Sequence, residues 1–404
     1  MNKAFRLFFI ILANLSIMFS FNCGGSGSES DSEEPYDIPE ESYYEAPLNP
    51  IKGNFSQSAK TLVSDMKYGW NLGNTLDAHS ETNIKTDYEV YWSQPKTTQS
   101  MVNGIKTSGL KTVRIPVSWH NHVNEAFTID KEWIERVQEV VDYGINSGLY
   151  VIVNIHHDNS EKWYFPNDYH SPKSQAFVSR IWKQIALRFR NYDEHLIFEF
   201  LNEPRLTGYT NEWNWNDSDE NLSEAADNIN ELNQLAIDTI RATGGNNDKR
   251  FVMIAPYVAS PWAALSSKFK MPEDSASDKL ILSVHAYTPY NFAMKDPGTA
   301  VFSDSAKSEI DSFMSRLNNK FISSMNIPVV IGEYGATNKN NLDERMKYFT
   351  YYVSKAHSYG MCPIVWDNGN YQIKGSSYAE LYGYYNRTDQ SWYFPDLLNT
   401  IISN

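Results

Sequence analysis

Eight short apolar runs separated by longer amphipathic stretches are the feature that most constrains the fold of this chain. Several runs are continuously apolar, as strands of a parallel sheet buried on both faces must be. The segments between them repeat apolar residues at helical spacing, which predicts helices with one face on the core. The expected strands are 68–71, 112–116, 150–155, 196–201, 251–255, 280–284, 328–331 and 362–366.

The order of these elements predicts a (β/α)8 TIM barrel with enlarged loops. Strands that alternate with helices form parallel sheets, and eight of them within residues 51–404 can close into a barrel. An open doubly wound sheet is the alternative. It would need a Gly-rich phosphate turn after the first strand, and the segment 69–74 lacks that spacing. We therefore expect a single barrel domain over 51–404.

Residues 1–22 have the pattern of a signal peptide. A basic start precedes an apolar run over 7–21, which is shorter than the ~20 residues that span a bilayer. Cys23 follows directly, before small residues, and this arrangement resembles a bacterial lipoprotein signal, in which the Cys is lipidated. Asn22 departs from the usual small residue. The alternative is an ordinary cleaved signal with an incidental Cys.

Residues 23–50 are expected to form a disordered acidic linker. They hold eight acidic residues and no Lys or Arg, and Ser, Gly and Pro make up much of the rest. Such a segment repels itself and extends. We therefore expect an exported protein, held as a lipoprotein at the cell surface or in the periplasm if Cys23 is lipidated, and secreted otherwise.

Charge and cysteine content exclude several classes of protein. The net charge of −14 argues against binding to nucleic acid, which calls for a basic surface. The two Cys cannot build a disulfide scaffold. Because Cys and His do not occur at metal-site spacing, we expect neither a metal nor a cofactor. Nothing in the sequence requires more than a monomer.

Polar and aromatic side chains gather where the predicted strands end. In a (β/α)8 barrel the carboxyl ends of the strands form the rim that carries the active site. A strand-end Glu, His, Arg or Trp taken alone is often structural, but together they favour a catalytic site. The candidates are Asn71, Arg114, His156, His157, Asn202, Glu203, His285, Tyr287, Glu333 and Trp366.

Glu203 and Glu333 are the candidates for catalysis. They follow the fourth and seventh strands, so they should face one cleft although 130 residues separate them. Two carboxyls in one cleft can be driven to different pKa values. Cleavage of a glycosidic bond needs this division, with one acid at the leaving oxygen and one ionised carboxylate at the anomeric carbon.

These motifs resemble glycoside hydrolase family 5, and in particular its subfamily 4 endoglucanases. The similarity covers about residues 55–400 and rests on an ordered set of segments rather than on a single motif. These segments are Gly69–Asp77, Arg114–His120, Asn202-Glu203-Pro204, Ser283–Tyr290 and Gly332-Glu333-Tyr334-Gly335.

The resemblance implies a retaining endo-β-1,4-glucanase that acts on cellulose, mixed-linkage glucan or xyloglucan. Glu203 would be the acid/base and Glu333 the nucleophile. Arg114 would lower the pKa of Glu333 and keep it ionised. Tyr287 would orient Glu333 by a hydrogen bond, with His285 as a second polar partner.

The remaining candidates would bind the β-glucan. Asn202 would bind the 2-hydroxyl, and His156, His157 and Asn71 would hydrogen-bond the sugar at the cleavage point. Trp366 would stack under that sugar. Aromatic residues in the rim loops suggest further stacking platforms along a groove, although about half of them should only pack the loops. These are Trp163, Tyr164, Phe165, Trp213, Trp215, Tyr257 and Trp262.

Three other functions compete with this interpretation. A β-mannanase could use the same scaffold, and a substrate panel would separate the two. A non-catalytic surface glycan-binding lipoprotein should have lost Glu203 or Glu333, and both are present. A metal-dependent barrel hydrolase would need His and Asp ligands on the first strand, and Trp70-Asn71 offers none.

Overall fold

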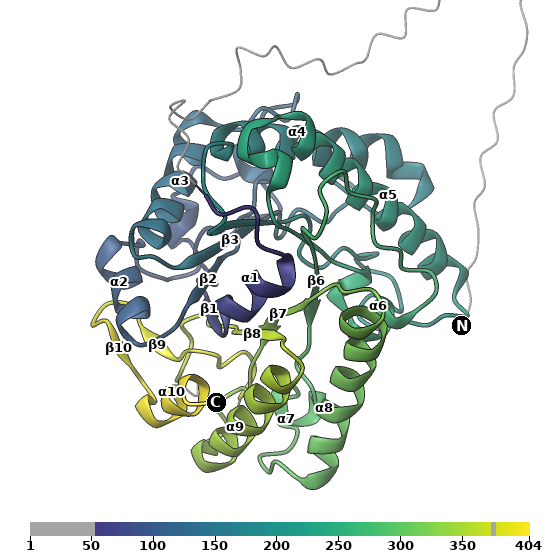
Figure 1. Cartoon of the computed structure of the whole chain (residues 1–404). Helices are drawn as coiled ribbons and strands as arrows, with labels where there is room; N and C mark the ends of the chain where they lie inside the picture. The colour runs from purple at the N-terminus through teal and green to yellow at the C-terminus, as the bar shows by residue number, and fades with distance from the viewer. Residues whose placement is uncertain (1–52, 373–376) are drawn as a thin grey trace, which may run out of the picture. The chain divides into compact units, whose positions relative to one another are not determined.

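The computed structural model describes residues 53–372 and 377–404. Within them, eight parallel strands pair in chain order and close into a barrel, with β8 paired to β1 (Figure 1). This confirms the predicted (β/α)8 barrel. The predicted signal peptide, Cys23 and acidic linker lie outside the described residues. The strands are β1 (Gly69–Asn71), β2 (Thr112–Ile115), β3 (Tyr150–Asn154), β4 (Leu196–Glu199), β5 (Val252–Ile254), β6 (Leu280–His285), β7 (Val329–Tyr334) and β8 (Cys362–Val365).

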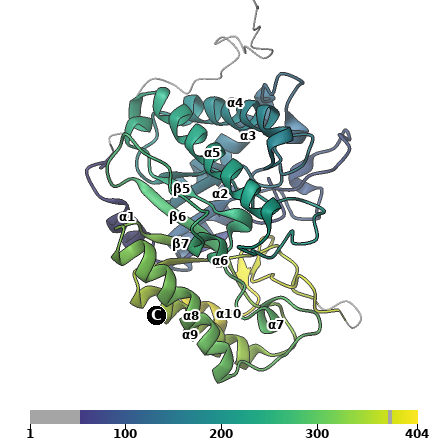
Figure 2. The same ribbon diagram turned by 90° about the vertical axis from the view of Figure 1, so that its right-hand side faces the viewer.

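Helices surround the barrel, and Figure 2 shows α8 and α9 along one flank. Several helices begin at a residue whose side chain caps free backbone N–H groups. Asp219 accepts from the N–H groups of Asn221 and Leu222 at the start of α5, and Ser303 accepts from the N–H of Ala306 at the start of α8. The helices are α1 (Ala59–Met66), α2 (Gln99–Thr107), α3 (Lys131–Asn146), α4 (Ser171–Phe189), α5 (Glu220–Ala242), α6 (Pro261–Leu265), α7 (Tyr290–Ala293), α8 (Asp304–Leu317), α9 (Leu342–Ser358) and α10 (Pro395–Ile402).

Shorter elements lie in the loops. A two-stranded hairpin of β9 (Tyr385–Asn386) and β10 (Ser391–Trp392) precedes α10. Five 3-10 turns lie at η2 (Tyr88–Val90), η3 (His120–His122), η4 (Asp168–His170), η5 (Gly245–Lys249) and η6 (Tyr257–Ala259), and a π-helical turn, η7 (Asn318–Ser323), extends α8.

Helix α1 lies across one end of the barrel (Figure 1). Its buried face, which includes Leu62, Val63 and Met66, packs with strand residues such as Ile152 and Ile197 in one apolar cluster. This cluster fills the end of the barrel at which the strands begin. Helix α1 and these side chains thus fill this end of the barrel in the part of the chain that the structure describes.

The barrel interior changes from apolar to polar along the strands. Position 152 on β3 is Ile and position 154 is Asn, and on β4 Ile197 is followed on the same face by Glu199. Asn154 pairs in register with Glu199, and both are fully buried. The layer of the core nearest the rim is therefore a buried polar network that supports the site above it.

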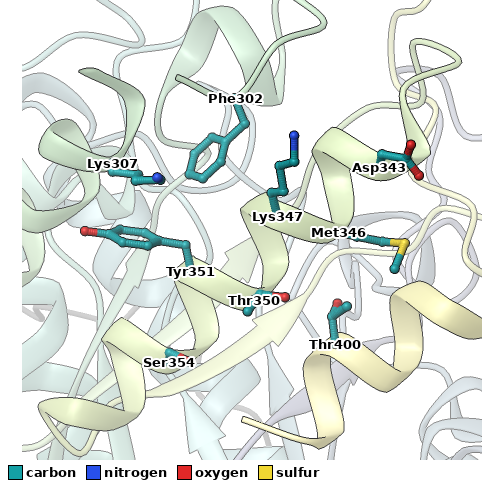
Figure 3. A pocket seen from close by; sticks show the side chains of 9 residues that line it. All are labelled: Phe302, Lys307, Asp343, Met346, Lys347, Thr350, Tyr351, Ser354 and Thr400. Atoms are coloured by element: carbon teal, nitrogen blue, oxygen red, sulfur yellow. The ribbon is translucent and has the colours of Figure 1, made fainter. Parts of the chain in front are cut away.

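A separate groove lies on the outside of the barrel between α8, α9 and α10 (Figure 3). Its volume is about 550 Å³, and Phe302, Met346 and Tyr351 give it apolar walls beside Lys307 and Lys347. It contains none of the predicted site residues. Among the described helices, none combines the length and the apolar character that crossing a bilayer requires.

Candidate active site

Glu203 and Glu333 meet at the rim of the barrel. One carboxylate oxygen from each and a ring nitrogen of His285 all lie within 4.8 Å of one another. Two carboxyls whose nearest oxygens are this close fit the ~5–5.5 Å spacing of retaining glycosidases better than the ~6.5–9.5 Å spacing of inverting ones. The two carboxylates, 130 residues apart in the chain, therefore share one site.

Arg114 connects most of the site. Its side chain is fully buried, and its Nη1 donates to Glu333 Oε1 and to Asn71 Oδ1, each at 2.9 Å. Its Nε donates to Glu199 Oε2 at 2.7 Å, and its Nη2 donates to Asn202 Oδ1 at 2.7 Å. The planar guanidinium thus fixes four neighbouring side chains relative to one another.

The two carboxylates have different surroundings. Glu333 accepts hydrogen bonds on both oxygens, from Arg114 at Oε1 and from the Tyr287 hydroxyl at Oε2, the latter at 2.9 Å. Glu203 Oε1 lies 2.8 Å from His285 Nδ1, which is 3.7 Å from Glu333 Oε1. The Glu203 side chain is 18% exposed and that of Glu333 is 7% exposed. Glu333 is thus the more firmly held carboxylate, and Glu203 the one more open to water.

The pKa values of the two carboxyls shift in opposite directions. Burial raises the pKa of Glu333, the charge of Glu203 adds to this, and together they outweigh the lowering by His285, Arg114 and Tyr287. Burial also acts to raise the pKa of Glu203, but the hydrogen bond and charge of His285 reverse it, so that pKa is lowered. The predicted contact between Arg114 and Glu333 is present, and Arg114 acts to lower the Glu333 pKa as predicted, but burial outweighs it and the net shift is upward.

His156 and Trp366 line the site beside the carboxylates. Their rings are stacked, with centroids 5.8 Å apart and planes 3° from parallel. Gly73 makes this placement of Trp366 possible, because a Cβ there would lie 2.8 Å from the indole ring. Burial lowers the pKa of His156 well below its ordinary value, so its imidazole is neutral and can exchange hydrogen bonds with hydroxyl groups.

His157 is half-buried next to this pair. Its ring centroid lies 4.4 Å from that of His156, and its Nε2 lies 3.8 Å from Asp77 Oδ2. Asp77, in the loop after β1, is not predicted from the sequence as a site residue. Together Asp77, His156 and His157 bring possible cation ligands within 4.8 Å of one another. Trp70-Asn71 on β1 offers no metal ligand, but Asp77 in the loop after β1 lies beside the two His residues that follow β3.

Asn202 and Asn71 both accept a hydrogen bond from Arg114, and Asn71 also bonds to the neighbouring strands. The Nδ2 of Asn71 donates to the Gly332 carbonyl at 2.9 Å and to the Val365 carbonyl at 3.2 Å, while its Oδ1 accepts from Arg114. The side chain is fully buried. The structure thus gives Asn71 the role of holding Arg114 and the neighbouring strands, and its predicted contact with sugar stays a prediction.

Glu199 is the largest omission from the sequence prediction. It is a fully buried carboxylate on β4 that accepts a hydrogen bond from Arg114 Nε. A signal was present in the sequence, since this Glu interrupts the otherwise apolar run 196–201. A buried charge of this kind requires a charged or hydrogen-bonding partner.

The rim-loop aromatic residues differ in exposure. Tyr164, Phe165 and Tyr257 are buried, and Trp163 and Trp215 are half-buried. Trp213 is 56% exposed, and the Arg205 guanidinium lies over its ring, 4.2 Å from the centroid. Because Arg205 also donates to the Glu203 carbonyl at 3.0 Å, Trp213 is held close to the loop of the candidate acid. Trp262 is likewise exposed.

A closed (β/α)8 barrel whose rim holds two adjacent carboxylates and a stacking Trp defines a barrel glycoside hydrolase. The family model described as cellulase (glycosyl hydrolase family 5) matches residues 76–372. The chain belongs to glycosyl hydrolase family 5.

Curated relatives and solved structures agree with this assignment. Endoglucanase B of Ruminococcus albus is 43% identical over 408 residues, which cover 96% of this chain and 93% of that protein. A broad specificity GH5-4 endoglucanase from Ruminococcus champanellensis with bound cellotriose has a TM-score of 0.81 and 40% identity, covering 87% of this chain and 100% of that one. A mutant family 5 lichenase from Caldicellulosiruptor sp. F32 in complex with cellotetraose has a TM-score of 0.82 and 42% identity, covering 89% and 98%.

Proposed function

We propose that the protein is a retaining endo-β-1,4-glucanase that hydrolyses internal bonds of plant β-glucans. The observation that carries this proposal is the separation of at most 4.8 Å between carboxylate oxygens of Glu203 and Glu333. The endoglucanase and lichenase names of the relatives, and the cello-oligosaccharides bound to two of the similar structures, support a β-glucan as the substrate.

Glu333 is the nucleophile in this mechanism. Arg114 and Tyr287 each hold one of its oxygens, so its carboxylate is fixed for attack on the anomeric carbon. The adjacent carboxyls of Glu203 and Glu333 titrate as a pair, and in the reacting form their shared proton lies on Glu203, although His285 lowers the pKa of that group. Glu203 gives this proton to the glycosidic oxygen as that bond breaks, and the chain beyond the bond leaves. A covalent glycosyl ester on Glu333 results.

Glu203 acts as a base in the second step. Its carboxylate takes a proton from water, the water oxygen attacks the anomeric carbon, and the ester bond to Glu333 breaks. The more exposed position of Glu203 fits this exchange with water. Two inversions leave the β configuration unchanged. Trp366 and His156 form the surface against which the reacting sugar packs, and Asn202, held by Arg114, binds its 2-hydroxyl.

A substrate panel tests the proposed function. Purified residues 51–404 would be incubated with barley mixed-linkage glucan, cellulose, xyloglucan and mannan, with product lengths recorded by chromatography and the first anomer by NMR. We expect oligosaccharides of several lengths from a β-glucan, released first as β-anomers. Preferential cleavage of mannan would favour the β-mannanase alternative, and an α-anomer as first product would overturn the retaining mechanism.

We also propose that the protein is exported and anchored by a lipid on Cys23. The basic and apolar segment before Cys23 and the acidic linker after it support this localisation. The substitution Cys23→Ser should release the enzyme from the membrane fraction of the expressing bacterium. Membrane association equal to that of the unmodified chain would refute the anchor.

A further inference from the structure

Glu199 is a buried charge that the mechanism above does not use. It lies on β4 inside the barrel and accepts three side-chain hydrogen bonds. Its Oε2 accepts from Arg114 Nε at 2.7 Å and from Asn154 Nδ2 at 2.9 Å, and its Oε1 accepts from the Ser283 hydroxyl at 2.6 Å. Glu199 has no exposed surface, so these three donors are the partners that a buried carboxylate requires.

Arg114 lies between Glu199 and Glu333. The Nε and Nη2 side of the guanidinium is within 2.7 Å of Glu199, and Nη1 on the other side is 2.9 Å from Glu333. The single positive charge of Arg114 therefore forms ion pairs with two carboxylates. Since the guanidinium is planar and rigid, the hydrogen bond from its Nε to Glu199, with the one from its Nη2 to Asn202, also determines where Nη1 points.

We propose that Glu199 is a positioning residue for the nucleophile Glu333. It orients Arg114 toward Glu333, and it shares the positive charge of Arg114 with Glu333. The inference rests on the proposed role of Glu333. If Arg114 were paired with Glu333 alone, its full charge would stabilise the carboxylate and make it a poorer nucleophile. With Glu199 opposite, Glu333 keeps its orientation and retains more of its basicity.

The charged and titratable groups around Glu333 come from three strands and the segments that follow them. Burial and Glu203 raise its pKa, and the other neighbours lower it. Loss of the Glu199 charge would strengthen the lowering of the Glu333 pKa by Arg114 and would leave the other charged and titratable groups around Glu333 in place. The groups are Arg114 from β2, Glu203 after β4, His285 at the end of β6 and Tyr287 just after it.

The test is the pH dependence of a glucan-cleaving enzyme with Glu199→Gln, which removes the charge and keeps the shape. We expect kcat to fall by about tenfold or more with little change in KM. We expect the acidic limb of the kcat/KM profile to move down by about one pH unit, because an opposite charge in contact lowers a carboxyl pKa by about 1–3 units. Glu199→Asp, which retains the charge, should keep the limb close to its original position.

Glu89→Gln is the matched control. Glu89 is also buried, and it pairs with Arg136 at 2.8 Å and accepts from the backbone of Thr97, away from the rim. It should change thermal stability but not the pH profile. An unshifted acidic limb in a folded, active Glu199→Gln enzyme would overturn the proposal, whereas an unmodified enzyme without glucanase activity would instead overturn the proposed function.

A second variant covers the case in which Glu199→Gln does not fold. Ser283→Ala removes one hydrogen bond to Glu199 Oε1 and leaves every charge in place. We expect a lower kcat at unchanged KM, because Glu199 then holds Arg114 less firmly. A kcat equal to that of the unmodified enzyme would count against the positioning role.

Discussion

The hydrogen bond from Tyr287 to Glu333 makes a quantitative prediction. Tyr287→Phe removes only the hydroxyl, which lies 2.9 Å from Glu333 Oε2 and lowers the pKa of that carboxyl. A hydrogen bond to a charged group contributes about 1.5–3 kcal/mol, and one pKa unit corresponds to about 1.4 kcal/mol. The pKa of Glu333 should therefore rise by about 1–2 units. Because Glu333 must be ionised to attack, activity should be lost at a higher pH on the acidic side.

The assay is kcat/KM against pH on a soluble β-glucan, which reports the ionisations of the free enzyme. The acidic limb of Tyr287→Phe should lie about 1–2 pH units above that of the parent. Tyr382→Phe is the control, since its ring lies 5.6 Å from that of Tyr287 but its hydroxyl donates to the Ala293 carbonyl instead. A limb that stays in place in Tyr287→Phe, or one that moves equally in Tyr382→Phe, would refute this reasoning.

Three further predictions concern the proposed catalytic groups. Glu333→Gln should reduce turnover by about 10⁴-fold or more while cellotetraose still binds, as measured by calorimetry; near-full activity would reject Glu333 as the nucleophile. Glu203→Ala should lose about 10²–10⁴-fold on glucan, but much less on an aryl cellobioside whose leaving group needs no proton, and added azide should restore the second step and give a β-glycosyl azide. If azide has no effect on rate or product, Glu203 is not the base. Dialysis against a chelator should leave activity unchanged, because the proposed chemistry needs only side chains; a loss restored by a divalent cation would point to Asp77, His156 and His157 as ligands.

The barrel and most of its rim could be predicted from local sequence. Each strand is a short apolar run between helical patterns, and such runs are readable because both faces of the strand are buried. Once the eight strands were placed in order, their carboxyl ends had to form one rim. This is why Glu203 and Glu333 could be paired, and the structure brings them together.

Other features depend on contacts that no local pattern encodes. The role of Asn71 depends on the carbonyl groups of Gly332 and Val365, which belong to other strands of the closed barrel. Helix α1 is short, and its role in covering the end of the barrel follows only from its packing against the strands. Glu199 could have been noticed as a charge in an apolar run, but its partners on β2, β3 and β6 could not have been named.

The sequence by itself determined the class of fold, the family and the carboxylates that face each other, because strand order and the residue after each strand are local properties. The tertiary structure decided how charge is distributed between them. Burial, the shared Arg114 and the position of His285 between Glu203 and Glu333 raise one pKa and lower the other. These effects depend on distances of a few ångströms between segments far apart in the chain, and electrostatic energies in a buried site change steeply over such distances.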